Sequence, residues 1–240
     1  ATSGNVAMVH VFNKTPYIGL FIKQPTAATN ATLKGTYNVF EYSDAVDASF
    51  KPATPGVQAY SLSFDGEGAF TVKSSYNPDS LASAFTAGTY SVAGGGRITF
   101  SSSKTEYAQV DPDGNLFAFV SYQAGGRCVF AVGVKQNSDS TWSGNFVEAA
   151  VKSSAENSTY ASYSNGTQVA VAGNSYAQSD AKTEKAEADA LKTLEFTISK
   201  GAITLTGVDA RAGVDPTGEL YCIVEKGAGS ARNFYFGVKK

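Results

Sequence analysis

The sequence predicts an all-β protein of two tandem antiparallel units, each a barrel or a sandwich of about a hundred residues, preceded by an extra N-terminal β-hairpin. Three observations predict this fold: short alternating apolar runs between turns, a block that occurs three times, and few helical signals. The repeated block is GNLFAFVSYQAGGRCVFAVGVKQ at 114–136, and variants of it open the chain at 4–24 and close it at 218–240.

Each copy of the block is predicted to form a β-hairpin. Every copy has two alternating apolar runs around a small polar or glycine-rich turn, where glycine supplies the positive φ that tight hairpin turns need. Aligned on the final lysine, the copies place apolar residues at the same positions, namely Val6, Leu116 and Leu220, then Val9, Phe119 and Ile223, then Ile22, Val134 and Val238.

The strands before the hairpin occur only twice. The segment 33–39 corresponds to 142–147, and 88–100 corresponds to 193–205. Both units then reach their hairpin through a D-P-x-G turn, with proline placed for a φ near −65° and glycine after it. The predicted organisation is therefore a surplus hairpin at 1–30, a first β unit at 31–138 and a second at 139–240.

One segment departs from the β pattern. Residues 180–192 are rich in helix formers, and Asp180 is placed to cap a helix N-terminus. We expect one short helix here, inserted between strands.

Two resemblances accompany these patterns. Gly35 and Tyr37 form a G-x-Y that resembles the opening of calycin barrels, the lipocalin and avidin group, where a glycine and an aromatic on the first strand close one barrel end. The succession G-T-Y, S-L-S-F-D-G-E-G-A-F-T, G-T-Y-S-V-A-G-G-G-R-I-T-F, D-P-D-G-N-L-F-A-F-V and F-A-V-G-V-K-Q resembles a tandem β-repeat of secreted proteins and lipoproteins of Gram-negative bacteria, mostly of unassigned function. It covers 33–136 more closely than 142–240 and implies export without specifying a chemistry.

Composition narrows the function classes. With 42% hydrophobic residues in 240, the chain can bury a sizeable core, and a net charge of −2 with 17% charged residues offers no basic face to nucleic acid. No apolar run is long enough for a membrane-spanning helix, and ATSGN lacks the features of a signal peptide, so we expect a mature or trimmed chain. Two cysteines, one methionine and one histidine are typical of exported surface proteins, which predicts an extracellular or cell-surface location.

Catalysis is not expected. His10 is the single histidine, and its repeat equivalents are Val120 and Val224, so neither a catalytic triad nor a histidine-rich metal site has support. Oxygen-bearing residues alternate in 111–115 as in a calcium loop, but the other copies change them, which favours a plain turn. We predict no enzyme activity, no cofactor and no metal.

Three further groups of residues are candidate sites. Glu41, Asp44 and Asp47 are predicted to lie in an acidic loop. Cys128 and Cys222 occupy non-equivalent repeat positions, so a disulfide between the units stays open while buried or unpaired thiols are favoured. Tyr160 and Tyr163, in the polar loop 157–167, are expected to face water, where they could stack on sugars or contact other subunits.

The surplus hairpin needs a partner, because a free hairpin leaves unpaired strand edges and apolar side chains in water. Three arrangements are open: packing on the first unit of its own chain, a remnant of an upstream repeat, or addition to the edge of a neighbouring subunit. The residues predicted for assembly are Val6, Met8, Val9, Val11, Ile18, Leu20 and Phe21.

Self-association through this hairpin is the leading functional hypothesis. It makes the protein a secreted structural subunit of an extracellular assembly or filament, a homo-oligomer joined by β-strand addition. The alternative is a calycin-like protein that binds a small hydrophobic ligand or a glycan. The run 116–120 is apolar on both faces, which favours packing over an open cup.

Overall fold

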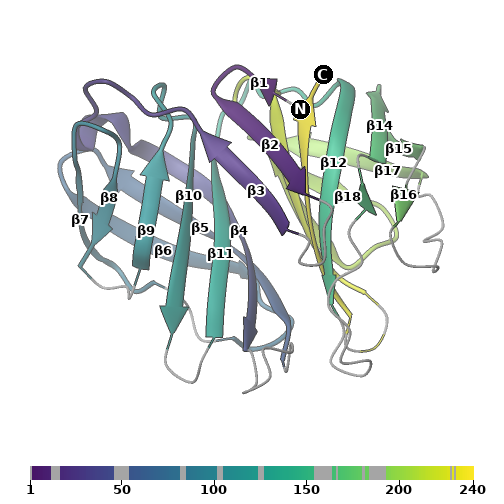
Figure 1. Cartoon of the computed structure of the whole chain (residues 1–240), viewed down its shortest axis with the longest axis horizontal. Coiled ribbons are helices and arrows are strands. Elements are labelled where there is room, and N and C mark those ends of the chain that lie inside the picture. The colour runs from purple at the N-terminus through teal and green to yellow at the C-terminus, as the bar shows by residue number, and fades with distance from the viewer. Residues whose placement is uncertain are drawn as a thin grey trace.

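The computed structural model describes residues 2–11, 17–45, 54–81, 85–101, 105–123, 127–153, 164–165, 167–179, 182–183, 193–227, 229 and 231–240. Within them the chain is almost entirely β, with two eight-stranded units side by side and a small N-terminal sheet between them (Figure 1). The predicted all-β fold of two tandem units and an extra hairpin is confirmed, and the choice between barrel and sandwich resolves to barrels.

The N-terminal sheet and the first barrel use the first eleven strands. The sheet has the order β1 (Thr2–Ser3), β2 (Val6–Val11), β3 (Tyr17–Ile22). A 3₁₀ turn, η1 (Asn30–Thr32), leads into β4 (Lys34–Ala45), β5 (Gly56–Asp65), β6 (Ala69–Tyr76), β7 (Gly88–Val92), β8 (Ile98–Phe100), β9 (Thr105–Val110), β10 (Leu116–Gln123) and β11 (Arg127–Lys135). Their order is β8-β7-β6-β5-β4-β11-β10-β9, and a bridge between Arg97 and Gln109 joins the two ends, so the barrel is nearly closed.

The second barrel is closed. It consists of β12 (Gly144–Ser153), β14 (Thr167–Ala172), β15 (Ser175–Ser179), β17 (Thr193–Ser199), β18 (Ala202–Leu205), β19 (Ala210–Val214), β20 (Leu220–Lys226) and β21 (Arg232–Lys239). Two short strands, β13 (Ser164–Asn165) and β16 (Lys182–Thr183), pair with each other. The predicted helix at 180–192 is therefore wrong at residues 182–183, which are extended and paired; the rest of that segment lies outside the described residues.

Aromatic side chains fill both barrels, because alternate residues of every strand point inward. In the first barrel the ring centroid of Tyr37 lies 5.5 Å from that of Phe64 and 5.3 Å from that of Phe117. In the second, the rings of Trp142 and Tyr221 lie 4.9 Å apart. These interiors are packed cores, as the apolar run 116–120 led us to expect.

A third apolar cluster, here called the inter-barrel core, joins the outer faces of the two barrels to β2. In Figure 1, β2 and β3 lie between the barrels, at the end of the molecule where the two chain termini meet. The buried members of this core are Val6, Met8, Phe40, Val57, Ala59, Tyr76, Leu116, Val132, Val134, Ala149, Leu220, Cys222, Val224, Phe234, Phe236 and Val238.

Candidate interaction site

The N-terminal hairpin β2–β3 is a third copy of a structure that each barrel also contains. In every copy the N–H of the final lysine donates a hydrogen bond of 2.8 Å to the carbonyl just before the first strand: Lys23 to Asn5, Lys135 to Asn115 and Lys239 to Glu219. Strand pairing agrees, since Val6 lies opposite Ile22 as Leu116 lies opposite Val134. The alignment drawn from sequence is thus also the structural one.

One face of the N-terminal hairpin is used inside its own chain. Val6 and Met8 are buried in the inter-barrel core, and Leu20 packs against it. The equivalent faces of β10–β11 and β20–β21 enter the same core. Of the residues predicted for assembly, Val6 and Met8 are therefore unable to meet a second molecule while the hairpin stays docked.

The opposite face of the hairpin is open. The side chain of Phe21 is 57% exposed. At its position the barrels have Gly133 and Gly237, and the ring of Phe117 or Tyr221 from the neighbouring strand covers that glycine. Ala7 stands where Phe117 and Tyr221 stand. In the N-terminal hairpin the small residue therefore lies on the first strand and the large one on the second, the reverse of the two barrel hairpins. In those hairpins the same face points into the barrel interior.

The outer edge of β3 is open as well. In the first barrel the equivalent edge of β11 pairs with β4, and in the second the edge of β21 pairs with β12. Among the described residues no strand pairs with this edge of β3. A strand edge with free N–H and C=O groups, beside an exposed aromatic side chain, is a template for strand addition.

Asn5 ties this open hairpin to the first barrel through a turn. Its Nδ2 donates to a carboxylate oxygen of Asp111 at 3.1 Å and of Asp113 at 2.6 Å. The other carboxylate oxygen of Asp111 accepts the backbone N–H groups of Asn115 at 2.8 Å and Leu116 at 3.0 Å. The segment 111–115 is therefore a hydrogen-bonded turn, as favoured over a calcium loop.

The second barrel has the same turn and also touches the hairpin. Asp215 accepts the N–H groups of Glu219 and Leu220, each at 2.8 Å. The carboxylate of Glu219 lies directly against Gly4. The hairpin is thus fixed at the point where the corresponding turns of both barrels meet.

Buried carboxylates are the feature that sequence reasoning missed. The acidic loop predicted for Glu41 and Asp44 is wrong for these two residues: both lie in β4 and are buried, while Asp47 is outside the described residues. Glu41 points into the first barrel, where Gln58 Nε2 donates to it at 2.7 Å and the Tyr60 hydroxyl at 3.0 Å. The signal was available, because Glu41 continues the alternate inward positions of Tyr37 and Val39.

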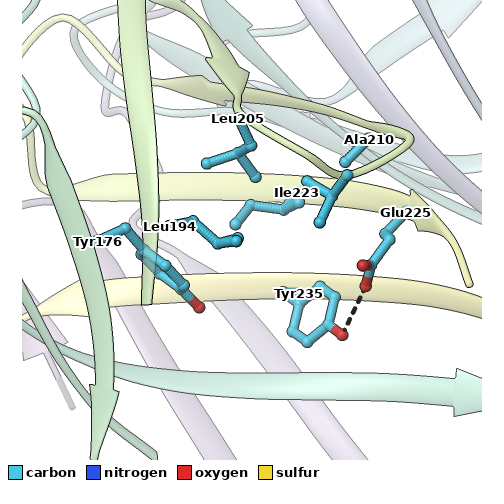
Figure 2. A pocket seen from close by; sticks show the side chains of 8 residues that line it. Tyr176, Leu194, Leu205, Ala210, Ile223, Glu225 and Tyr235 are labelled. Atoms are coloured by element: carbon cyan, nitrogen blue, oxygen red, sulfur yellow. Dashed lines mark hydrogen bonds between the residues drawn. The ribbon is translucent and has the colours of Figure 1, made fainter. Parts of the chain in front are cut away.

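The second barrel holds its own carboxylates. Glu148 accepts the hydroxyls of Tyr176 and Tyr221, each at 2.7 Å. Near one end, Glu225 accepts the hydroxyl of Tyr235 at 2.9 Å and borders a small hollow that is partly open to solvent. Figure 2 shows Leu205, Ala210 and Ile223 among the other side chains around this hollow. Its lining is apolar apart from Glu225 and the tyrosine hydroxyls.

The remaining predicted site residues are not brought together. Tyr160 and Tyr163 lie outside the described residues. His10, Val9, Val11 and Ile18 lie in β2 or β3, but the structure does not describe their side chains. Within the described ranges no group of three or more His, Cys, Asp and Glu side chains is arranged to hold a metal ion.

The open disulfide question resolves against a bond between Cys128 and Cys222. Both are free thiols, Cys128 exposed on β11 and Cys222 buried in the inter-barrel core. Burial raises the pKa of the Cys222 thiol far above its ordinary value, which suppresses the reactive thiolate.

Thiol labelling should separate these two cysteines. A water-soluble thiol reagent is expected to modify one thiol per native chain and two in denaturant, because only Cys128 is accessible. The Cys128→Ser variant should lose the fast reaction and Cys222→Ala should keep it. Two fast thiols, or none before reduction, would contradict this placement.

The fold and the hairpin define a class of protein: a tandem β-barrel repeat with an open hairpin between its barrels. No model of a known protein family matches the chain, and no curated protein matches it either. Of the residues that the structure describes, no helix has the length and apolar character needed to cross a membrane.

Proposed function

We propose that the chain is a secreted structural subunit of an extracellular surface assembly, and that copies join by β-strand addition at the outer edge of β3. The observation that carries the proposal is that edge: the two equivalent edges, on β11 and β21, are each paired with a strand. Phe21, exposed beside it, adds apolar area for a partner to bury.

The state of the barrel interiors also supports a structural role. Rings from several strands, and from Phe85 just before β7, are in contact in the first barrel: the ring centroid of Phe85 lies 4.7 Å from that of Phe100 and 4.8 Å from that of Phe119. A barrel filled in this way has no room for a ligand of ordinary size. The few charges and the abundant Ser, Thr and Gly suit an exported surface protein.

A Phe21→Lys substitution should weaken self-association. Full burial of a phenylalanine is worth about 1.5–3 kcal/mol, so the apparent association constant should fall about 10- to 100-fold. Light scattering over a concentration series, with negative-stain imaging of the largest species, measures the change. Thr71→Lys, at an exposed position on the paired strand β6, is the matched control.

Two outcomes would count against assembly through β3. One is an unmodified chain that stays monomeric at its solubility limit. The other is polymerisation that Phe21→Lys and Thr71→Lys leave equally unchanged, since the contact would then lie elsewhere.

Ligand binding is the second candidate, and the hollow beside Glu225 is the observation that favours it. The hollow has a volume of only about 10 Å³, far below the roughly 300–1,000 Å³ of small-molecule sites, so a ligand would have to displace the side chains that line it. Binding of a small apolar fluorescent dye, abolished by the filling substitution Ile223→Trp and retained in Val92→Trp of the first barrel, would support it.

A further inference from the structure

The contact between the two barrels is made by the hairpin of one barrel and the first strands of the other. The outer face of β20–β21 packs on the outer face of β4–β6, where Val224 and Phe234 are fully buried. The ring of Phe234 lies 5.5 Å from that of Phe130. Arg232 forms an ion pair with Asp79, just after β6, and the Tyr76 hydroxyl donates to the carbonyl of Asp209 at 2.9 Å. The hairpin of one barrel is thus covered by the first strands of the other.

The equivalent face of the first barrel's hairpin is bare over half its length. Val120, the counterpart of Val224, is 43% exposed, and Tyr122 is 51% exposed. Tyr107, paired with Val120 across the strands, is 47% exposed, and Cys128, the counterpart of Arg232, is exposed. Tyr107, Val120, Tyr122 and Cys128 are here called the bare stripe. The bare stripe is the exposed continuation, along the same strands, of the apolar face whose other half is buried in the inter-barrel core.

The N-terminal hairpin occupies a third position of the same kind. It enters the inter-barrel core, as the other two hairpins do, together with Val147 and Ala149 on the outer face of β12. Two of the three hairpins therefore meet strands of a barrel that is not their own: β20–β21 meets the first barrel, and β2 shares a core with β12 of the second. The first barrel's hairpin has no such neighbour along its lower half. The strands that would cover it are those that would complete a barrel with β2–β3, and the described residues contain none.

We infer that the open edge of β3 and the bare stripe are two parts of one docking site, and that this site receives a six-stranded half-barrel of the same repeat, the counterpart of β4–β9. This rests on the proposed function in taking β3 as a receiving edge. The first strand of the half-barrel pairs with β3 as β4 pairs with β11. Its interior covers Phe21, and its outer face covers the bare stripe as β4–β6 cover β20–β21.

The site also specifies part of the occupant's chemistry. Its first strand pairs in the register of β4 on β11, which sets the counterpart of Val39 opposite Phe21. Cys128 and Tyr122 stand where the second barrel has Arg232 and Lys226. A carboxylate at the occupant's counterpart of Asp79 would therefore find no cation at the bare stripe. We expect the occupant to carry a neutral or apolar side chain at that position, because an unpaired carboxylate would be buried against tyrosine.

A chain with an added half-barrel tests the inference. A copy of residues 29–113, with Asp79 changed to Ala, is joined directly to Gly4, which rebuilds the D-P-D-G turn ahead of the hairpin. The rate of Cys128 labelling is the readout, because Cys222 is buried. We expect the rate to fall about tenfold or more relative to the unmodified chain, as a covered thiol reacts only after local opening.

The matched control carries a copy of residues 29–136, with the copy's own Cys128 changed to Ser, joined to Ala1 by a flexible linker. This copy includes its own hairpin and does not need β3, so Cys128 should keep the rate of the unmodified chain. Equal rates in all three proteins overturn the inference. So does an added half-barrel that circular dichroism and proteolysis show to be unfolded, because a matching docking site would fold it.

The two proposals can fail separately. Self-association of the unmodified chain together with an unprotected Cys128 in the half-barrel fusion would leave the assembly role and remove this docking site. A monomeric unmodified chain together with a protected Cys128 in the half-barrel fusion would remove the assembly role and leave the docking site.

Discussion

A Gly114→Ala substitution is expected to lower the free energy of unfolding by about 3 kcal/mol, through two effects that act together. Gly114 has a φ of +65°, which disfavours any residue with a Cβ atom. A Cβ there would also overlap the carbonyl oxygen of Thr32, which is backbone and has little freedom to move. The carbonyl of Gly114 accepts the buried Tyr37 hydroxyl at 2.6 Å, so any shift of the turn strains that bond too.

Two comparisons separate the steric effect from the dihedral effect. Gly173 and Gly207 also have positive φ, +57° and +80°, but a Cβ at either would meet no atom within 4 Å. Alanine at these positions should cost only about 1 kcal/mol. Gly218, the counterpart in the second barrel, would place its Cβ 2.8 Å from the Thr141 carbonyl and should resemble Gly114.

Urea unfolding of the four variants measures these differences. If Gly114→Ala is no more destabilising than Gly173→Ala, the close approach to Thr32 does not constrain the turn. The prediction matters for function because this turn accepts Asn5, through which the N-terminal hairpin is attached.

The D-P-x-G turns show how much of the fold sequence alone could predict. Proline and glycine fix local backbone angles, so Asp111 to Gly114 and Asp215 to Gly218 were recognisable as the same turn. The hairpin copies were equally recognisable, since strand alternation and glycine-rich turns are local properties. Fold class and repeat alignment follow from such signals.

The role of the N-terminal hairpin could not be predicted, for a physical reason. Both of its faces carry apolar residues, Val6 and Met8 on one and Phe21 on the other, so alternation cannot tell which face is buried. That choice is made by Phe236 and Val238, more than 200 residues away in sequence, which supply the surface of the inter-barrel core. The helix expected at 180–192 rested on local signals, helix propensity and a capping residue, and strand pairing of Lys182 and Thr183 overrides them at those two residues.

Glu41 gives the second large prediction, a stability that falls as pH rises. Burial raises the pKa of Glu41 from 4.5 to about 7, although the hydrogen bonds from Gln58 and Tyr60 and the charge of Arg127 act in the opposite direction. Below pH 4.5 the carboxyl is protonated in both the folded and the unfolded chain. Between pH 4.5 and about 7 the unfolded chain loses this proton and the folded chain keeps it, so each unit of pH favours unfolding.

The expected loss is about 3 kcal/mol by pH 8, since one unit of pKa shift corresponds to about 1.4 kcal/mol. Other groups titrate over the same range, so the measured quantity is the difference between the unmodified chain and Glu41→Gln, taken by urea unfolding at several pH values. Glutamine keeps the shape and cannot ionise. The variant should therefore gain on the unmodified chain by about 3 kcal/mol between pH 4.5 and pH 8.

Glu67→Gln controls for the loss of a carboxylate as such, because Glu67 is exposed in the turn between β5 and β6. A difference curve for Glu41→Gln that stays flat across this range would mean that the barrel interior admits water or a cation to the carboxylate. Glu41 lies on β4, which pairs with β11 and not with β3, so its ionisation is expected to act on the stability of the first barrel and not on the open edge of β3. Assembly through β3 and the stability of the first barrel should then respond to pH through different groups, and comparing both in Glu41→Gln would separate them.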